Sequence, residues 1–204
     1  MHGHRASPSP EVDVFQLSLA LLSLLSVLWP AAEPPVPERW HAWPTIRIFP
    51  HTVPGTSPSG ARVTYVLAGV APETSCRAAF QRRALPALPG CLTALRATYT
   101  DSTETYVATV GIAVLAKPGR RTSARWGGRP PTVRPAAFSG GPAERFGARQ
   151  YFTGGRAAVR DRYVVLAAAG YADGRAYRPG DRAPARLRAT ARQLATALHR
   201  NLTR

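Results

Sequence analysis

The chain has 204 residues, 45% of them hydrophobic, and carries a net charge of +16. This length allows one ordinary domain plus a short extra segment, and the apolar content excludes global disorder. Its 20 prolines and 17 glycines follow no period, which excludes a collagen-like chain. Lys117 is the only lysine, and the arginines are dispersed along the chain rather than gathered in long runs. Compositional bias therefore explains the charge better than a surface dedicated to nucleic acid.

An uncharged segment, residues 14–32, follows a short N-terminal tail, residues 1–13. A helix of 19 residues spans roughly 28 Å, close to the hydrocarbon thickness of a bilayer. The segment also has the character of a signal peptide's apolar region, but Trp29 and Pro30 make a poor cleavage site. We therefore expect a single-pass membrane anchor with the C-terminal domain outside, or a secreted protein if the segment is cleaved.

Cys76 and Cys91 are the only two cysteines. An even number of cysteines in an exported chain predicts a disulfide, and closing a loop of about 15 residues stabilises a fold by about 3 kcal/mol. Two unrelated buried thiols are the alternative. The spacing of cysteines and histidines fits neither a metal site nor a redox motif, so we expect no metal and no cofactor.

Residues 33–60 are expected to form a proline-rich linker with an edge strand, and residues 61–204 the extracytoplasmic domain. Within the linker, residues 33–44 are expected to be stiff and extended and to lift the domain off the membrane. The apolar stretch 45–49 is expected to form the edge strand, and the composition of residues 51–60 is typical of a loop.

Alternating side chains predict a strand over residues 62–70, followed by a helix over residues 74–86 that ends at a proline. Further strands are expected over residues 91–101 and 105–116. The second of these is apolar on both faces, which is typical of a central strand.

Residues 117–142 are rich in arginine, glycine and proline, which indicates irregular structure. A short helix is expected over 143–152, a strand over 161–170, and an amphipathic helix from Asp181 to the end of the chain. The fold class is therefore α+β with a mostly antiparallel sheet. The order of elements suggests a ferredoxin-like βαββαβ plan with an added C-terminal helix.

Several short motifs resemble a known type of protein. They are Ile-Phe-Pro at 48–50, GVAPETSC at 69–76, RATYTD at 96–101, TVGIAVL at 109–115 and AAAGYADGR at 167–175. With them the chain resembles membrane-anchored or secreted proteins of GC-rich actinobacteria over about residues 43–176. The resemblance implies an extracytoplasmic location, and it brings no activity, cofactor or catalytic residue.

The candidates for catalysis are weak. His51 with Ser57 or Ser59 would give a base and a nucleophile, but all three fit ordinary loop residues. Asp101 and Glu104 share a hairpin loop, where acidic residues are common in turns. We expect no catalytic residue, and a small envelope hydrolase is the alternative.

We therefore expect a membrane-anchored extracytoplasmic domain with a non-enzymatic binding, sensing or accessory role at the cell envelope. A basic cytoplasmic protein that binds polyanions is a second alternative. Besides the membrane contact through residues 14–32, the surplus charge predicts weak attraction to anionic lipid or wall polymer, without sequence-specific nucleic-acid binding. The arginines expected to carry this attraction are Arg120, Arg121, Arg125, Arg186, Arg188 and Arg192.

Overall fold

The computed structural model describes residues 32–57, 59–118, 132–147, 153–156, 161–176 and 183–204. Within the chain, Pro34–Arg204 forms one compact unit. The predicted anchor, residues 14–32, lies outside the described residues except for Ala32. None of the helices in the described part of the chain combines the length and the apolar character needed to cross a bilayer.

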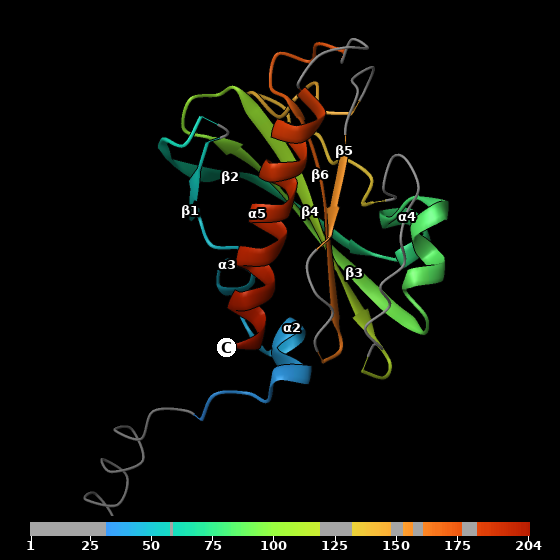
Figure 1. Ribbon diagram of the computed structural model, residues 1–204. Helices are drawn as coiled ribbons and strands as arrows, with labels where there is room; N and C mark the ends of the chain where they lie inside the picture. Colours follow the sequence, from blue (N-terminus) through green and yellow to red (C-terminus); the bar gives the residue numbers. More distant parts are fainter. Residues whose placement is uncertain (1–31, 58, 119–131, 148–152, 157–160, 177–182) are drawn as a thin grey trace, which may run out of the picture. The chain divides into compact units, whose positions relative to one another are not determined.

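Six antiparallel strands form one curled sheet in the order β1-β2-β3-β4-β6-β5 (Figure 1). The strands are β1 (Thr52–Thr56), β2 (Arg62–Thr74), β3 (Cys91–Asp101), β4 (Tyr106–Leu115), β5 (Thr153–Arg156) and β6 (Tyr163–Tyr171). The structure confirms the α+β class and the four long predicted strands. As expected for a central strand, β4 is buried along its whole length.

The ferredoxin-like plan is wrong. That plan places another strand between the two strands that flank the first helix, whereas β2 and β3 pair directly, with Tyr65 opposite Asp101. The helix predicted over residues 74–86 is broken into α4 (Cys76–Ala79), capped by Ser75, and the 3-10 helix η2 (Arg82–Ala87). Between them Phe80 is extended and forms a β-bridge with Val133. Because no long helix crosses the sheet between β2 and β3, β3 pairs directly with β2 in the antiparallel direction.

The compact unit begins at Pro34 rather than at residue 61. Its first elements are the 3-10 helix η1 (Val36–Glu38) and the short helices α2 (Arg39–Ala42) and α3 (Thr45–Ile48). The edge strand predicted over residues 45–49 is therefore a helical turn, and the true edge strand, β1, lies where a loop was predicted. Trp43, Ile48 and Phe49 are buried in the core, so burial folds this segment onto the domain instead of leaving it extended.

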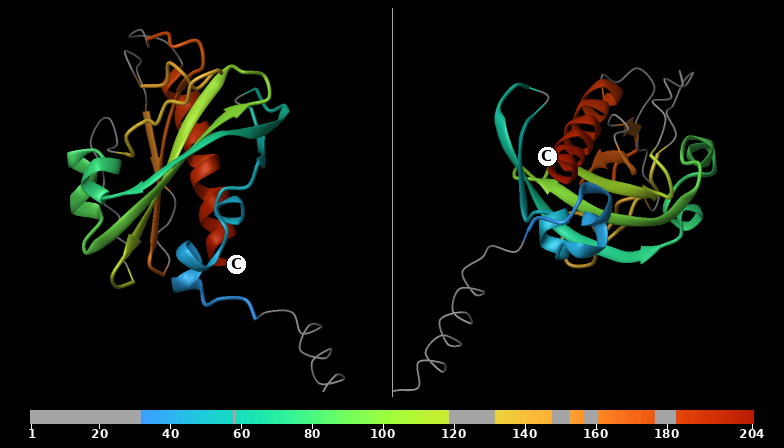
Figure 2. Two further views of the ribbon diagram at one scale, coloured as in Figure 1. Left: turned by 180° about the vertical axis from the view of Figure 1, so that it is seen from behind. Right: turned by 90° about the horizontal axis from the view of Figure 1, so that it is seen from below.

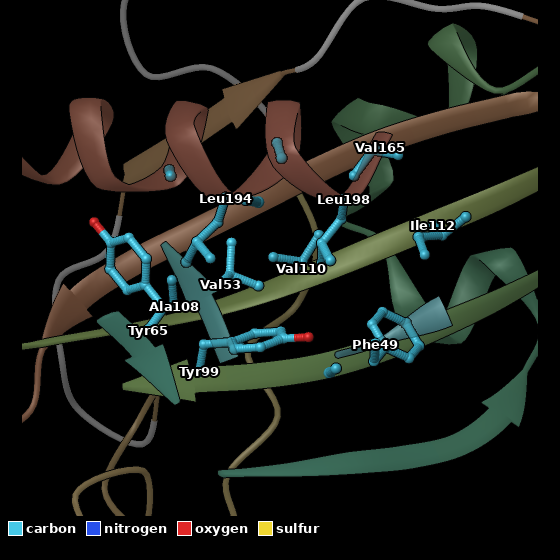
Figure 3. Close-up of a cluster of buried hydrophobic side chains, with 14 of the residues drawn as sticks. Phe49, Val53, Tyr65, Tyr99, Ala108, Val110, Ile112, Val165, Leu194 and Leu198 are labelled. Atoms are coloured by element: carbon cyan, nitrogen blue, oxygen red, sulfur yellow. The ribbon is translucent and has the colours of Figure 1, made fainter. Parts of the chain in front are cut away.

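One face of the sheet is covered by α5 (Ala183–Thr203) (Figures 1 and 2), which confirms the predicted C-terminal helix. Its predicted start, Asp181, lies outside the described residues. Leucines of α5, including Leu194 and Leu198, pack on strand side chains such as Val53, Tyr65, Tyr99, Val110, Ile112 and Val165 (Figure 3). The helix contacts β1 as well as β5 and β6, so it bridges the two edges of the curled sheet.

The other face of the sheet is covered by irregular chain. α4, η2 and residues 132–147 pack there around buried Phe80, Val133 and Phe146. Residues 132–138, which we call the strap, lie across the strands: Thr98 Oγ1 donates to the Ala136 carbonyl (2.7 Å) and Thr109 Oγ1 accepts from the Ala136 N–H (2.9 Å).

The strap also needs a glycine beneath it. A Cβ atom on Gly111 would lie 2.6 Å from Val133 Cγ2, so only a glycine in β4 lets Val133 pack so closely.

Two short segments also differ from the prediction. Residues 143–147, the described part of the helix predicted over 143–152, form turns. The residues of β5, for which no strand was predicted, pair with β6 as an edge strand. Because Gly154 and Gly155 are successive glycines, this segment lacks the residue pattern that indicates a strand.

The cysteine pair was predicted correctly. Cys76 and Cys91 lie at disulfide-bonding distance, and their Cα atoms are 6.3 Å apart. The pair joins α4 to the beginning of β3, so it fastens the irregular layer to the sheet.

Candidate functional site

Two hollows lie beside α5, near opposite ends of the helix. The first, the Arg200 hollow, has a volume of about 310 Å³. The second, the Arg186 hollow, has a volume of about 320 Å³. The Arg200 hollow lies between α5 and β1, whereas the Arg186 hollow lies between the first turn of α5, the turn after β1 and the neighbouring ends of β2, β3 and β4.

The Arg200 hollow combines apolar walls with positive charge. Val53 and Leu198 are buried core residues in its lining, and Arg200 and Arg204 are exposed on the helix. Asn201 Nδ2 donates a hydrogen bond to the Arg47 carbonyl (2.7 Å), which ties α3 to α5 beside the hollow. Guanidinium groups next to an apolar wall suit a ligand that is both anionic and partly apolar.

Arg39 fixes the end of α5 that bears this hollow. Its side chain is only 8% exposed, and Nη1 donates to the carbonyls of Leu202 (2.9 Å) and Arg204 (2.6 Å). Carbonyl groups in the last turn of a helix lack intrahelical partners, and a cation is favourable there. The buried charge is thus matched by backbone oxygens at the C-terminal end of α5.

Trp43 lies between two of these cations. The guanidinium carbons of Arg39 and Arg47 lie 4.7 Å and 4.3 Å from the centre of its ring. Cation–π attraction favours this arrangement. Neither arginine was predicted as a site residue, although the spacing of four residues on either side of Trp43 was a signal.

The Arg186 hollow is lined by hydroxyl groups and two arginines. Arg62 of β2 and Arg186 of α5 contribute the cations. The hydroxyl groups come from Ser57, Ser59, Thr103, Thr105 and Tyr106. Guanidinium and hydroxyl groups together donate hydrogen bonds to oxyanions such as phosphate or carboxylate.

Asp101 also borders the Arg186 hollow, but its carboxylate is occupied. Oδ1 accepts from the backbone N–H groups of Thr105 (2.8 Å) and Tyr106 (2.7 Å), and Oδ2 accepts from Thr103 Oγ1. The side chain is almost fully buried. Asp101 therefore shapes the loop between β3 and β4, which is the turn role expected from the sequence.

Tyr65 separates the two hollows. Its hydroxyl donates to Gln193 Oε1 of α5 (3.0 Å), and its ring lies over Gly55 of β1. Burial, reinforced by the negative charge of Asp101, raises the pKa of Tyr65, so the phenol remains a protonated donor at neutral pH. The hollows are therefore two sites rather than one continuous groove.

The predicted arginines do not form one cluster. Arg186, Arg188 and Arg192 are all exposed on α5. Arg186 lines a hollow, whereas Arg188 and Arg192, one helical turn apart, follow the side of α5 where its backbone touches Gly155 of β5. Arg120, Arg121 and Arg125 lie outside the described residues. Three arginines that line the hollows were not among those predicted: Arg62, Arg200 and Arg204.

The groups considered for catalysis have other contacts. The hydroxyl oxygens of Ser57 and Ser59 lie 2.7 Å apart and hydrogen-bond to each other. His51 is exposed just before β1. Among the described residues, histidine, cysteine, aspartate and glutamate side chains do not gather in groups that could hold a metal ion.

Comparison with protein-family models, curated proteins and solved structures yields no match to this chain. The fold and its hollows define the protein as an α+β domain with one curled antiparallel sheet closed by a C-terminal helix. The arginines along α5 are therefore the features that bear most directly on its function.

Proposed function

We propose that this protein is a non-enzymatic, extracytoplasmic binding domain that is held at the membrane by residues 14–32 and recognises anionic groups of the cell envelope. The observation that carries the proposal is the placement of arginines in both hollows along α5: Arg62 and Arg186 in one, Arg200 and Arg204 in the other. The planar guanidinium group is well suited to binding phosphate and carboxylate groups through paired hydrogen bonds.

Three features support the envelope location. The uncharged segment 14–32 has the length of a membrane span. A cysteine pair at disulfide-bonding distance is typical of exported proteins. The resemblance to membrane-anchored or secreted actinobacterial proteins also favours export.

The expected ligands are anionic lipid headgroups or acidic wall polymers. Their attraction to exposed arginines is long-ranged and tolerant of ligand sequence. It is also screened within about 8 Å at physiological ionic strength. Binding by this domain should therefore be weak, and it should depend strongly on salt.

A binding titration tests the ligand class. Residues 34–204 are produced as a soluble fragment and titrated with anionic vesicles, with neutral vesicles as the reference, at increasing salt. We expect binding to anionic vesicles at low salt and its steep loss as salt rises. Binding that persists at high salt, or no binding at low salt, contradicts the proposal.

A pair of matched variants assigns the binding to the hollows. Arg186→Glu with Arg200→Glu changes one arginine in each hollow, whereas Arg77→Glu with Arg82→Glu makes the same change in charge on exposed residues of α4 and η2. We expect the first pair to weaken binding more than the second. Equal losses would show that net charge alone attracts the vesicles.

A protease experiment tests the compartment. Protease added to intact spheroplasts should degrade the compact unit, Pro34–Arg204, while a cytoplasmic marker survives. Protection of the unit would contradict the extracytoplasmic location.

A further inference from the structure

We propose that one defined end of the domain docks on the anionic headgroups of the membrane that holds the protein. This docking end consists of α2, α3 and the last turn of α5, residues 39–48 and 200–204. The inference rests on the proposed anchor, residues 14–32, and adds to it an orientation and a lipid-binding surface.

The tether between the apolar segment and the folded domain is short. Only Glu33, Pro34 and Pro35 lie between the apolar segment and η1. Three residues of extended chain span at most about 10 Å. The spacer expected over residues 33–44 does not exist as such, because η1 and α2 belong to the compact unit. A chain anchored through residues 14–32 therefore holds this end of the domain close to the headgroups.

The first helical turns of the compact unit contact the C-terminal end of α5. Arg39 binds the carbonyls of Leu202 and Arg204, and Asn201 binds the Arg47 carbonyl. The last turn of α5 therefore lies beside α2 and α3 (Figure 2). The Arg186 hollow lies near the other end of a helix of 21 residues, roughly 30 Å long. The Arg200 hollow is thus the one within reach of the membrane.

The docking end combines exposed positive charge with an exposed apolar side chain. Arg47, Arg200 and Arg204 are exposed there, and Glu38 of η1 is the exposed acid beside them. Ile46 of α3 is 43% exposed, and an apolar side chain among cations is typical of a surface that lies at a membrane interface. In the Arg200 hollow, the guanidinium groups are placed for a lipid phosphate while Pro54 and Ala197 offer apolar contact.

A depth measurement on the full chain tests the docking. The chain is reconstituted into nanodiscs of neutral or anionic phospholipid, with a nitroxide on Ile46→Cys or, as the reference, on Ser102→Cys. Both positions are exposed, and Ser102 lies in the loop that borders the Arg186 hollow. Because the native cysteines are paired, the new thiol is labelled selectively.

In anionic discs we expect the label at residue 46 to be shielded from a water-soluble nickel reagent and accessible to oxygen. The label at residue 102 should remain accessible to nickel in both kinds of disc. Equal nickel access at residue 46 in neutral and anionic discs would overturn the docking proposal.

Charge-reversal variants then identify the contacts. Arg200→Glu with Arg204→Glu should restore nickel access at residue 46, because each arginine near an anionic surface contributes roughly fivefold to binding. Arg77→Glu with Arg82→Glu, the matched pair on the other face of the sheet, should leave the label shielded. If both pairs restore access equally, charge alone attracts the domain, and the proposed surface is wrong.

A wash distinguishes failure of the anchor from failure of the docking. A chain that stays with the discs after an alkaline wash is anchored, so nickel access at residue 46 in that sample refutes the docking alone. A chain that the wash removes refutes the anchor and, with it, the docking proposal.

Discussion

The two faces of the sheet are covered in different ways. One face is covered by a single regular helix, α5, whose buried leucines pack on the strands. The other is covered by two short helical turns and the strap, fastened by a cysteine pair and by threonine hydroxyl groups. The irregular layer therefore relies more on specific polar and covalent links, whereas α5 relies mainly on apolar contact.

The reason lies in the backbone. A helix satisfies most of its N–H and C=O groups internally, so α5 needs few polar links to its neighbours. Those it makes, through Gln193, Asn201 and the Leu202 carbonyl, join it to Tyr65, α3 and Arg39. The strap has no such ladder, and buried backbone groups that lack partners are costly. Side chains from both layers form hydrogen bonds with backbone groups of the other layer. Thr98 and Thr109 of the sheet bind the C=O and N–H groups of Ala136, and Thr132 Oγ1 of the strap donates to the Ala167 carbonyl (2.7 Å).

The largest effect is expected from breaking the helical face. Leu194 is fully buried between α5 and the sheet, so Leu194→Ala should lower the free energy of unfolding by about 2–5 kcal/mol through lost apolar contact and a residual cavity. Thr196→Ala, an exposed position two residues away, is the control. Denaturant unfolding measures both, and a loss below about 1 kcal/mol for Leu194→Ala would contradict this account of the helical face.

A smaller effect is expected from opening the cysteine pair. Reduction should lower the free energy of unfolding by about 3 kcal/mol, given the 15-residue separation. Amide hydrogen exchange should quicken in α4, η2 and the strap more than in α5. In a Cys76→Ala, Cys91→Ala double variant, the reductant should change neither the free energy of unfolding nor the rate of hydrogen exchange. Uniform quickening across both layers would show that the pair stabilises the fold as a whole rather than the irregular layer.

The same contrast explains how much of the fold could be predicted. The strands β2, β3, β4 and β6 and the helix α5 carry long periodic patterns, and they were found. The edge strand β1 reads Thr-Val-Pro-Gly-Thr, which resembles a loop because an edge strand tolerates proline and needs few apolar residues. The stretch at 45–49 was misread because Ile48 and Phe49 are buried by a helical turn rather than by a strand.

The candidate site was predicted only in part. Arg186 was found, because exposed arginines on an amphipathic helix are visible in the sequence. Arg62 lies in the same hollow as Arg186 only because the turn between β1 and β2 packs near the first turns of α5. No local sequence pattern predicts this contact. The contact of Thr98 with Ala136 likewise links residues 38 positions apart.

The smallest effect is expected from loosening the strap. The hydroxyl oxygens of Thr98 and Thr109 lie 2.7 Å apart and hydrogen-bond to each other. Because the Thr98 hydroxyl donates its proton to the Ala136 carbonyl, Thr109 is the donor in this bond. Thr109→Val keeps the shape of the side chain but leaves the Ala136 N–H without its acceptor. We expect a loss of about 1–2 kcal/mol in the free energy of unfolding.

Hydrogen exchange makes this last prediction specific to one face. The Ala136 amide should exchange faster in Thr109→Val, while the amides of α5 keep their protection. Thr64→Val, an exposed position on β2, serves as the control for replacing a threonine in this sheet. If Thr109→Val matches that control in stability and in exchange at Ala136, then the apolar packing of Val133 on Gly111 and of Phe138 on Gly69 holds the strap without help. The two faces would then be stabilised by the same means, contrary to the comparison drawn from their hydrogen bonds.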